Sequence, residues 1–134
     1  MDLQECFKKG LIKKTIPNQE LISSLKEMAD IKEMTVNEAN INEKNISAYV
    51  SLAYDALREI LEAVAVLNGF KVLSHICLGE LLKEFDYEEF DRIRWIRNSI
   101  NYYGHKIDFD QGKEIIKKIF HMKKTIVENY LKPF

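Results

Sequence analysis

One long apolar stripe constrains the fold more than any other feature of the sequence. Between residues 46 and 67, large apolar side chains recur every three or four positions, and no proline or glycine interrupts them before Gly69. The stripe consists of Ile46, Tyr49, Val50, Ala53, Leu57, Ile60, Leu61, Val64 and Leu67. This period predicts an amphipathic helix, and a helix of this length is typically the central helix of a bundle. The capping-box pattern from Thr35 to Glu38 places its start near residue 35.

Shorter periodic stretches predict the remaining helices. We expect them over residues 2–14, 18–34, 74–85 and 86–103, followed by a last helix that begins at Asp108 or Asp110 and stops before Pro133. Gly69 and Gly104 stand just past two of the expected helix ends, where a left-handed residue is common. No alternating strand pattern competes with the helices. The sequence therefore predicts an all-α, single-domain antiparallel bundle of about five helices, with N-terminal helices in residues 1–34 and the core bundle in residues 35–134.

Composition limits the class of protein. A chain of 134 residues that is 46% hydrophobic and 31% charged is of ordinary size and polarity for one globular domain. Because its net charge is only −1, no overall positive field attracts it to nucleic acid or to an anionic membrane, so any nucleic-acid contact must be local. No apolar stretch is long enough to cross a bilayer, and no apolar signal region begins the chain. We expect a cytoplasmic protein without a membrane partner.

The two cysteines carry no metal-binding pattern. Cys6 and Cys77 stand alone, without a second cysteine or a histidine at ligand spacing. Buried thiols in a reducing compartment are the favoured interpretation, and a disulfide between the two is the alternative. The sequence also contains no serine–histidine–aspartate set and no glycine-rich phosphate loop. We therefore predict no metal and no cofactor.

The least ordinary polar segment ends the helix expected over residues 86–103. It contains the candidate ligand-binding residues Arg97, Asn98, Asn101, Tyr102 and His105. A guanidinium group, amides and aromatic rings close together suit a phosphate or a nucleobase. On a helical projection Arg94, Arg97 and Asn101 share one flank of the buried stripe and can converge. We interpret five further basic side chains as solvated surface, namely those of His75, Lys113, Lys117, His121 and Lys124.

The same helix has a second partly apolar face. Arg92, Trp95, Ser99 and Tyr102 recur there at spacings of three and four. A helix that is apolar on two sides usually lies between two neighbours or at a subunit interface, so we expect a homodimer. A charged flank on the long helix offers Arg97 an internal alternative, because a carboxylate there would make the arginine structural. That flank consists of Asp55, Arg58, Glu59 and Glu62.

These features together resemble the HEPN (higher eukaryotes and prokaryotes nucleotide-binding) domain. The resemblance covers roughly residues 45–131 and rests on Arg97-Asn98, the polar and aromatic run to His105, and the long preceding helix with Tyr49, Tyr54, Leu57 and Ile60. It implies a small helical bundle that is commonly homodimeric. Active members of the family are metal-independent ribonucleases that carry such an arginine and histidine. Others are paired with a minimal nucleotidyltransferase in toxin–antitoxin modules, or act only as binding domains.

The resemblance implies roles for two residues. His105 would act as the general acid or base and Arg97 would stabilise charge on the phosphate. Seven residues separate them, more than in the family, and on one helix they would lie roughly 80° and more than about 10 Å apart. We therefore expect a binding module for a nucleotide, RNA or a partner nucleotidyltransferase. The alternatives are an endoribonuclease with Arg97 and His105 as catalytic residues, and a purely structural dimeric subunit.

Overall fold

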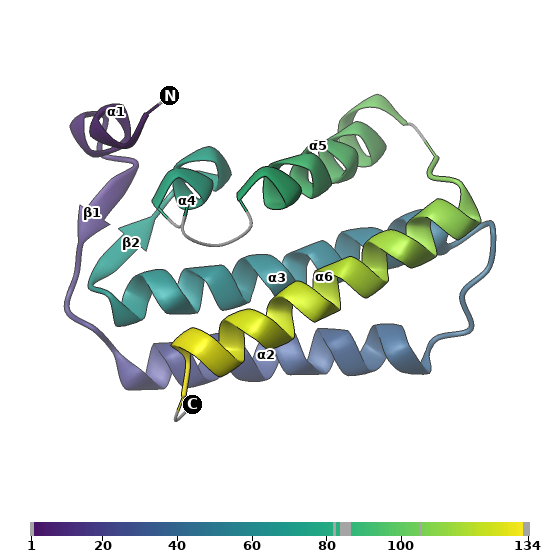
Figure 1. The fold of residues 1–134 in the computed structure, drawn as a ribbon, viewed down its shortest axis with the longest axis horizontal. Coiled ribbons are helices and arrows are strands. Elements are labelled where there is room, and N and C mark those ends of the chain that lie inside the picture. The colour runs from purple at the N-terminus through teal and green to yellow at the C-terminus, as the bar shows by residue number, and fades with distance from the viewer. Residues whose placement is uncertain (1, 82, 84–86, 105, 133–134) are drawn as a thin grey trace.

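The central helix of the bundle is α3 (Ile46–Leu67), and the other long helices pack around it (Figure 1). The computed structural model describes residues 2–81, 83, 87–104 and 106–132. Helix α2 (Gln19–Glu38) lies on one side of α3, α5 (Tyr87–Tyr103) lies on the opposite side, and α6 (Phe109–Tyr130) crosses the same central helix. The described part of the chain holds six helices and one two-stranded ribbon, which confirms the all-α bundle.

Helix α3 is central because most of its surface is apolar. Val50, Tyr54, Leu57 and Ile60 are fully buried, and small alanines between them let neighbouring helices approach closely. Helix α6 packs tightly on α3 at Gly112, where an added Cβ would overlap the side chain of Ile46. The buried stripe predicted from the sequence is therefore the core of the bundle.

The predicted start of α3 at residue 35 is wrong. Thr35 lies inside α2, where its hydroxyl donates to the carbonyl of Ile31 at 2.8 Å instead of capping a new helix. The chain turns later, where the side-chain oxygens of Asn42 and Asn45 each accept a backbone N–H from the other residue, at 3.1 and 2.8 Å. Such side-chain bonds to the backbone compete with the helix and favour a turn. The boundary expected between residues 34 and 35 also falls inside α2.

Several other helix ends agree with the sequence. Asn18 accepts the backbone N–H of Leu21 and begins α2, and Asp108 accepts that of Gln111 and begins α6. Helix α4 (His75–Leu81) starts beside Ser74, as expected. Gly69 and Gly104 have φ values of +86° and +67°, so both adopt the left-handed conformation just past a helix end. Asp86 and Pro133, two other predicted boundary residues, lie outside the described residues.

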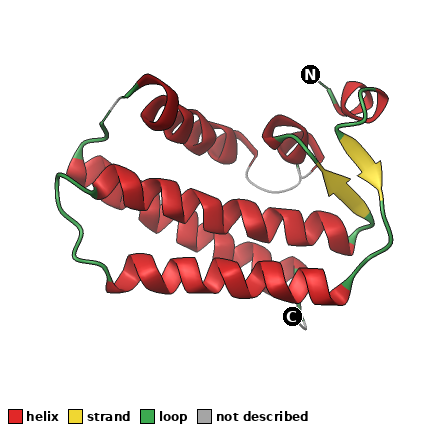
Figure 2. Ribbon diagram, turned by 180° about the vertical axis from the view of Figure 1, so that it is seen from behind, coloured by secondary structure: helices red, strands yellow, loops and turns green. Residues whose placement is uncertain are grey.

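The N-terminal segment differs from the single helix expected over residues 2–14. Helix α1 (Leu3–Lys8) ends before Gly10, whose φ is +72°, and strand β1 (Ile12–Lys14) follows it. Strand β1 pairs antiparallel with β2 (Phe70–Val72), in the register Ile12↔Val72, Lys13↔Lys71 and Lys14↔Phe70. Figure 2 shows this ribbon beside the helices, at the end of the molecule that carries the N-terminus. A three-residue strand is too short to show alternation, which explains why the sequence did not reveal it.

A disulfide joins the N-terminal segment to α4. Cys6 and Cys77 are bonded, with their Cα atoms 5.8 Å apart, so the expectation of two free thiols is wrong. Both sulfur atoms lie in a small second core with Ile12, separate from the main core around α3. Because the two cysteines are 71 positions apart, only the fold brings them together. None of the described helices is long and apolar enough to cross a membrane.

Candidate functional site

Helix α5 carries the predicted site and rests on α3 along one face. Phe90 and Ile93 are buried there, and Ile96 and Ile100 are partly buried against the same core. The Phe90 ring stacks on the ring of Tyr54 with their centroids 5.9 Å apart and their planes 15° apart. This apolar contact fixes which side of α5 faces inward and therefore which polar residues lie at the α3–α5 junction.

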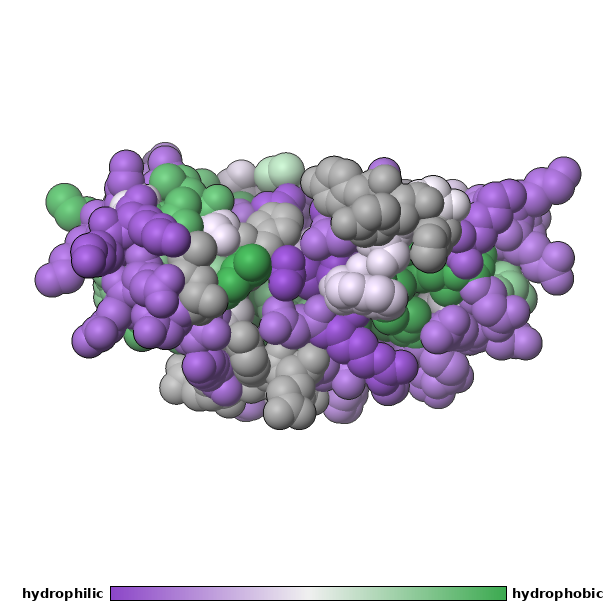
Figure 3. All heavy atoms as spheres, turned by 90° about the horizontal axis from the view of Figure 1, so that it is seen from above, coloured by the Kyte–Doolittle hydropathy of each residue, from purple (hydrophilic) through white to green (hydrophobic). Residues whose placement is uncertain are grey.

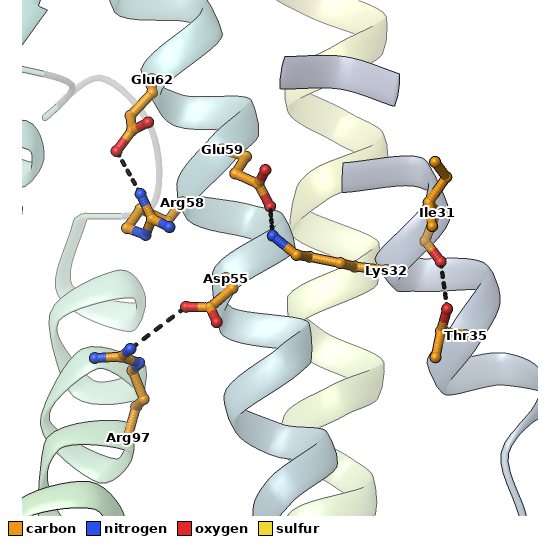
Figure 4. A network of polar contacts seen from close by, with 8 residues as sticks. All are labelled: Ile31, Lys32, Thr35, Asp55, Arg58, Glu59, Glu62 and Arg97. Carbon is orange, nitrogen blue, oxygen red and sulfur yellow. Dashed lines mark hydrogen bonds and ion pairs between the residues drawn. The ribbon is translucent and has the colours of Figure 1, made fainter. Parts of the chain in front are cut away.

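Arg97 lies at that junction, and its charge is engaged within the chain. Its guanidinium lies 5.0 Å from the centroid of the Tyr54 ring, and its terminal nitrogen lies 3.5 Å from Oδ1 of Asp55 (Figure 4). Only 19% of the Arg97 side chain is exposed. Its Nε atom is buried and has no hydrogen-bond partner in the described structure. The structure therefore shows the internal contact that the sequence offered as an alternative, in which a carboxylate of α3 pairs with Arg97.

The charged residues on the flank of α3 have different partners. Asp55 faces Arg97, while Arg58 pairs with Glu62 on its own helix at 2.6 Å. Glu59 is buried and forms an ion pair with Lys32 of α2 (Figure 4). Among the side chains that the structure describes, Asp55 is the flank residue that pairs with α5, whereas Glu59 links α2 to α3.

Burial and a nearby positive charge have opposite effects on the pKa of Tyr54. Burial raises the pKa of its hydroxyl to about 12, and the nearby charge of Arg97 lowers the pKa in part. The phenol consequently stays neutral throughout the physiological range. A neutral ring against a guanidinium is the arrangement of a cation–π contact, which here stabilises the packing of α5 on α3.

The other predicted site residues do not all converge with Arg97. Asn101 is exposed, and its side-chain oxygen lies 3.5 Å from the hydroxyl of Ser51 on α3. Arg94 pairs with Asp91 on α5 itself, at 3.3 Å. Arg97 and Asn101 therefore both face α3, one helical turn apart, whereas Arg94 is held by its own helix.

The side chain of Asn98 does not lie beside that of Arg97, and part of the predicted motif falls outside the described residues. Asn98 is partly exposed, on the side of α5 that turns away from the core stripe. Tyr102 belongs to α5, but its side chain is outside the described part of the structure, and His105 lies outside it altogether. The pairing of Arg97 with His105, which the alternative of an endoribonuclease requires, falls outside the described residues and is not tested.

The second face of α5 is open. Trp95 is 67% exposed, and Arg92, one turn before it, is also exposed, whereas Ser99 on the same side is buried. In Figure 3, which looks onto the side of the molecule where α5 lies, most of the described surface is hydrophilic. Among ordinary surface residues, a tryptophan this exposed is unusual. We call the surface of Arg92, Trp95 and Asn98 the outer face of α5.

A groove opens between the start of α5 and the outer part of α6. Its volume is about 770 Å³, with Met122 and Ile126 among its apolar lining residues and Lys117 and His121 among its polar ones. Lys118 and Glu89 also line the groove, and their ion pair of 3.5 Å joins its two sides. The sequence placed Lys117 and His121 on a solvated face, and only the packing of α5 and α6 on α3 reveals that this face borders a concavity.

Sequence reasoning also missed one buried cation. Lys123 of α6 is only 7% exposed, and its ammonium lies 2.7 Å from a carboxylate oxygen of Asp30 and 2.7 Å from one of Glu33, both on α2. Burial lowers the pKa of Lys123, but the hydrogen bonds to the two carboxylates outweigh this effect and raise it above 10.5. Lys123 recurs between Ile119 and Ile126 at the spacing of the buried stripe, which is the signal that could have identified it.

Comparison with known proteins identifies no relative: no family model, no curated protein and no solved structure matches this chain. Within the described ranges, no group of three or more histidine, cysteine, aspartate or glutamate side chains is placed to hold a metal ion.

Proposed function

We propose that this chain is a non-catalytic binding module that binds single-stranded RNA on the outer face of α5. The observation that carries the proposal is the 67% exposure of Trp95 beside the exposed Arg92. Bases of a single strand stack on aromatic side chains, and a neighbouring arginine adds a cation–π contact or a phosphate contact. Asn98 supplies both a donor and an acceptor on the same face.

The contacts of Arg97 support a role without catalysis. A phosphate clamp must present its guanidinium to the ligand, but the charge of Arg97 already faces Asp55 and the Tyr54 ring. Presenting it outward would break both contacts and leave Asp55 without its partner. Arg97 therefore positions α5, and the ligand-binding role passes to residues on the opposite side of the helix. The resemblance to HEPN domains that act only in binding is consistent with this proposal.

A homodimer through the same face is the second candidate function. Tryptophan and arginine are the residues that most often dominate the energy of protein interfaces, and Trp95 and Arg92 lie one turn apart. A second copy, or a partner nucleotidyltransferase, that covered this face would bury Trp95. This candidate predicts a change at Trp95 that depends on protein concentration, whereas RNA binding predicts a change that depends on RNA.

The fluorescence of Trp95 separates the two candidates, because it is the only tryptophan in the chain. The purified protein is titrated with a single-stranded RNA oligonucleotide of mixed sequence in the presence of a metal chelator. We expect saturable quenching of the emission. Trp95→Ala, assayed by anisotropy of a labelled RNA, should weaken binding by about 5- to 100-fold, as expected for the loss of one stacked base.

Three controls define the outcomes of the titration. A double-stranded RNA of the same sequence should quench less, because its bases are already stacked. Dilution without RNA should leave the emission unchanged, and a shift on dilution would favour the homodimer. An emission that RNA leaves unchanged at every concentration would exclude the outer face of α5 as the RNA-binding surface.

A further inference from the structure

Positive charge is concentrated at one end of this nearly neutral chain. Residues 2–16 and 69–73, which we call the basic arm, contain α1, β1 and β2 and carry the lysines Lys8, Lys9, Lys13, Lys14 and Lys71. Their acidic residues are Asp2 and Glu5 alone. All five lysines are exposed, and within the described structure none of them forms an ion pair. The near-zero net charge of the chain therefore conceals a local excess of positive charge, and the expectation from net charge that no anionic membrane attracts the chain does not hold for this end of the molecule.

The register of the ribbon places two of these lysines directly opposite one another. Lys13 and Lys71 are cross-strand partners, and both are exposed. Like charges at opposed positions of an antiparallel pair destabilise the sheet, because their side chains lie close on one face. An anionic partner on that face would remove the repulsion. The arrangement thus favours binding of an anion over the isolated state.

Apolar side chains lie on the same face as these lysines. Leu11 and Leu73 continue the ladder, since the backbone N–H of Leu73 donates to the carbonyl of Leu11 at 2.8 Å. Side chains alternate along a strand, so Leu73 projects on the same side as Lys13 and Lys71. Leu73 is 54% exposed on this face, and Ile16, two residues past the end of β1, adds a second aliphatic side chain to the arm that is 86% exposed. The basic arm therefore displays both lysines and aliphatic side chains.

The arm is built as a rigid platform. Cys6 and Ile12 are buried in its own small core, and the disulfide from Cys6 to Cys77 ties α1 to α4. A ring contact between Phe7 and Phe70, with centroids 5.7 Å apart, closes this core further. The exposed lysines and aliphatic side chains are consequently displayed on a fixed surface and need not be ordered when a partner binds.

We propose that the basic arm binds the surface of a membrane that contains anionic phospholipids. Lysines on a local surface are attracted to such a membrane, and exposed aliphatic side chains enter the region between the headgroups and the acyl chains. A nucleic acid fits less well, because the arm contains no arginine and the rings of Phe7 and Phe70 pack against each other. Leu73 and Ile16 would also gain nothing from a phosphate backbone.

The test is sedimentation of the full chain, with its disulfide intact, with vesicles of phosphatidylcholine alone or mixed with phosphatidylserine. We expect binding only to the anionic vesicles, and its loss at high salt. The double variant Lys13→Glu/Lys71→Glu should weaken binding by about tenfold or more. Ile16→Ser/Leu73→Ser should weaken it severalfold at unchanged charge, which shows that the aliphatic side chains also contribute.

A matched variant controls for net charge. Lys117→Glu/Lys124→Glu changes the total charge by the same amount on exposed positions of α6, and it should bind the anionic vesicles like the parent chain at physiological salt. Thermal melting of each variant confirms that the fold survives. Equal binding to both vesicle types, no binding to either, or an equal loss in the α6 variant would overturn the proposal. So would a Lys13→Glu/Lys71→Glu variant that keeps its vesicle binding and loses affinity for RNA.

Discussion

The guanidinium of Arg97 lies against the ring of Tyr54, with 5.0 Å between its central carbon and the ring centroid. Phe90 stacks on the same ring. Arg97 and Phe90 both belong to α5, so two residues of this helix contact the same buried tyrosine of α3. This contact helps to fix the orientation of α5 on α3, in which Trp95 faces outward.

Replacing Arg97 should therefore reduce stability. Arg97→Ala removes the cation–π contact and leaves Asp55 without its ion pair, so we expect a loss of about 2 kcal/mol in the free energy of unfolding. Urea denaturation followed by circular dichroism measures this loss. The matched control is Arg92→Ala on the exposed side of the same helix, which should change the free energy by less than about 0.5 kcal/mol. Equal effects of the two variants would contradict the structural role of Arg97.

The buried cation Lys123 should be a second determinant of stability. Lys123→Ala removes the hydrogen bonds to Asp30 and Glu33 and leaves these two carboxylates close together on α2. Because both carboxylates keep some contact with water, we expect a loss of about 2 kcal/mol rather than the larger cost of a fully buried pair. Lys124→Ala, at the exposed neighbouring position, is the control and should be nearly neutral. Thermal melting of both variants under the same conditions tests this difference.

The same cluster should determine part of the pH dependence of stability. Burial raises the pKa of Asp30, but hydrogen bonds from Lys123 and Lys26 outweigh it and hold the pKa below 3.8. The contribution of Asp30 is thus complete above pH 3.8 and is lost as the pH falls through the lower pKa of the folded state. The pKa of Lys123 is raised above 10.5, so its contribution is complete below that pH and is lost as the pH rises further.

The comparison of Lys123→Ala with the parent chain isolates this effect. Between these limits the difference in unfolding free energy should stay constant, and it should shrink toward both acid and alkaline pH. Urea titrations at a series of pH values measure it. A difference that changed across the neutral range would show that another group is coupled to Lys123.

The disulfide should stabilise the arm more than a local contact would. It closes a loop of 71 positions, and the loss of such a link typically costs about 2 to 4 kcal/mol. The double variant Cys6→Ala/Cys77→Ala should show this loss in urea denaturation. Disulfides persist in oxidising compartments, so trapping the thiols in cells tests the cytoplasmic expectation. A fully reduced pair in the folded protein would contradict the bond and support the thiols first expected from the sequence.

Local signals in the sequence predicted the elements that depend on neighbouring residues. Asp108 and Gly104 mark the boundaries around the turn into α6 because capping and a left-handed residue are local effects. The ribbon could not be foreseen, since Lys13 meets Lys71 only after the whole of α2 and α3 has folded between them. The prediction that a helix begins at Thr35 failed for another reason, because the capping-box pattern also fits the interior of a helix.

The candidate site shows the same limit. The charged flank of α3 suggested a partner for Arg97, but periodicity could not decide whether the guanidinium turns toward Asp55 or toward a ligand. Trp95 was expected to lie in a second contact, and its exposure shows that any such partner must come from outside the described chain. The position of a side chain within a helix is thus predictable, whereas its choice between an internal and an external partner depends on packing.

The affinity for single-stranded RNA of Arg92→Ala and Arg97→Ala, measured by anisotropy at a temperature where both are folded, tests the central claim most directly. We predict that Arg92→Ala, although as stable as the parent chain, binds RNA several times more weakly. Arg97→Ala, although less stable, should bind with the affinity of the parent chain and leave the RNA intact. The reverse pattern, in which Arg97→Ala abolishes binding or cleavage while Arg92→Ala has no effect, would contradict the account.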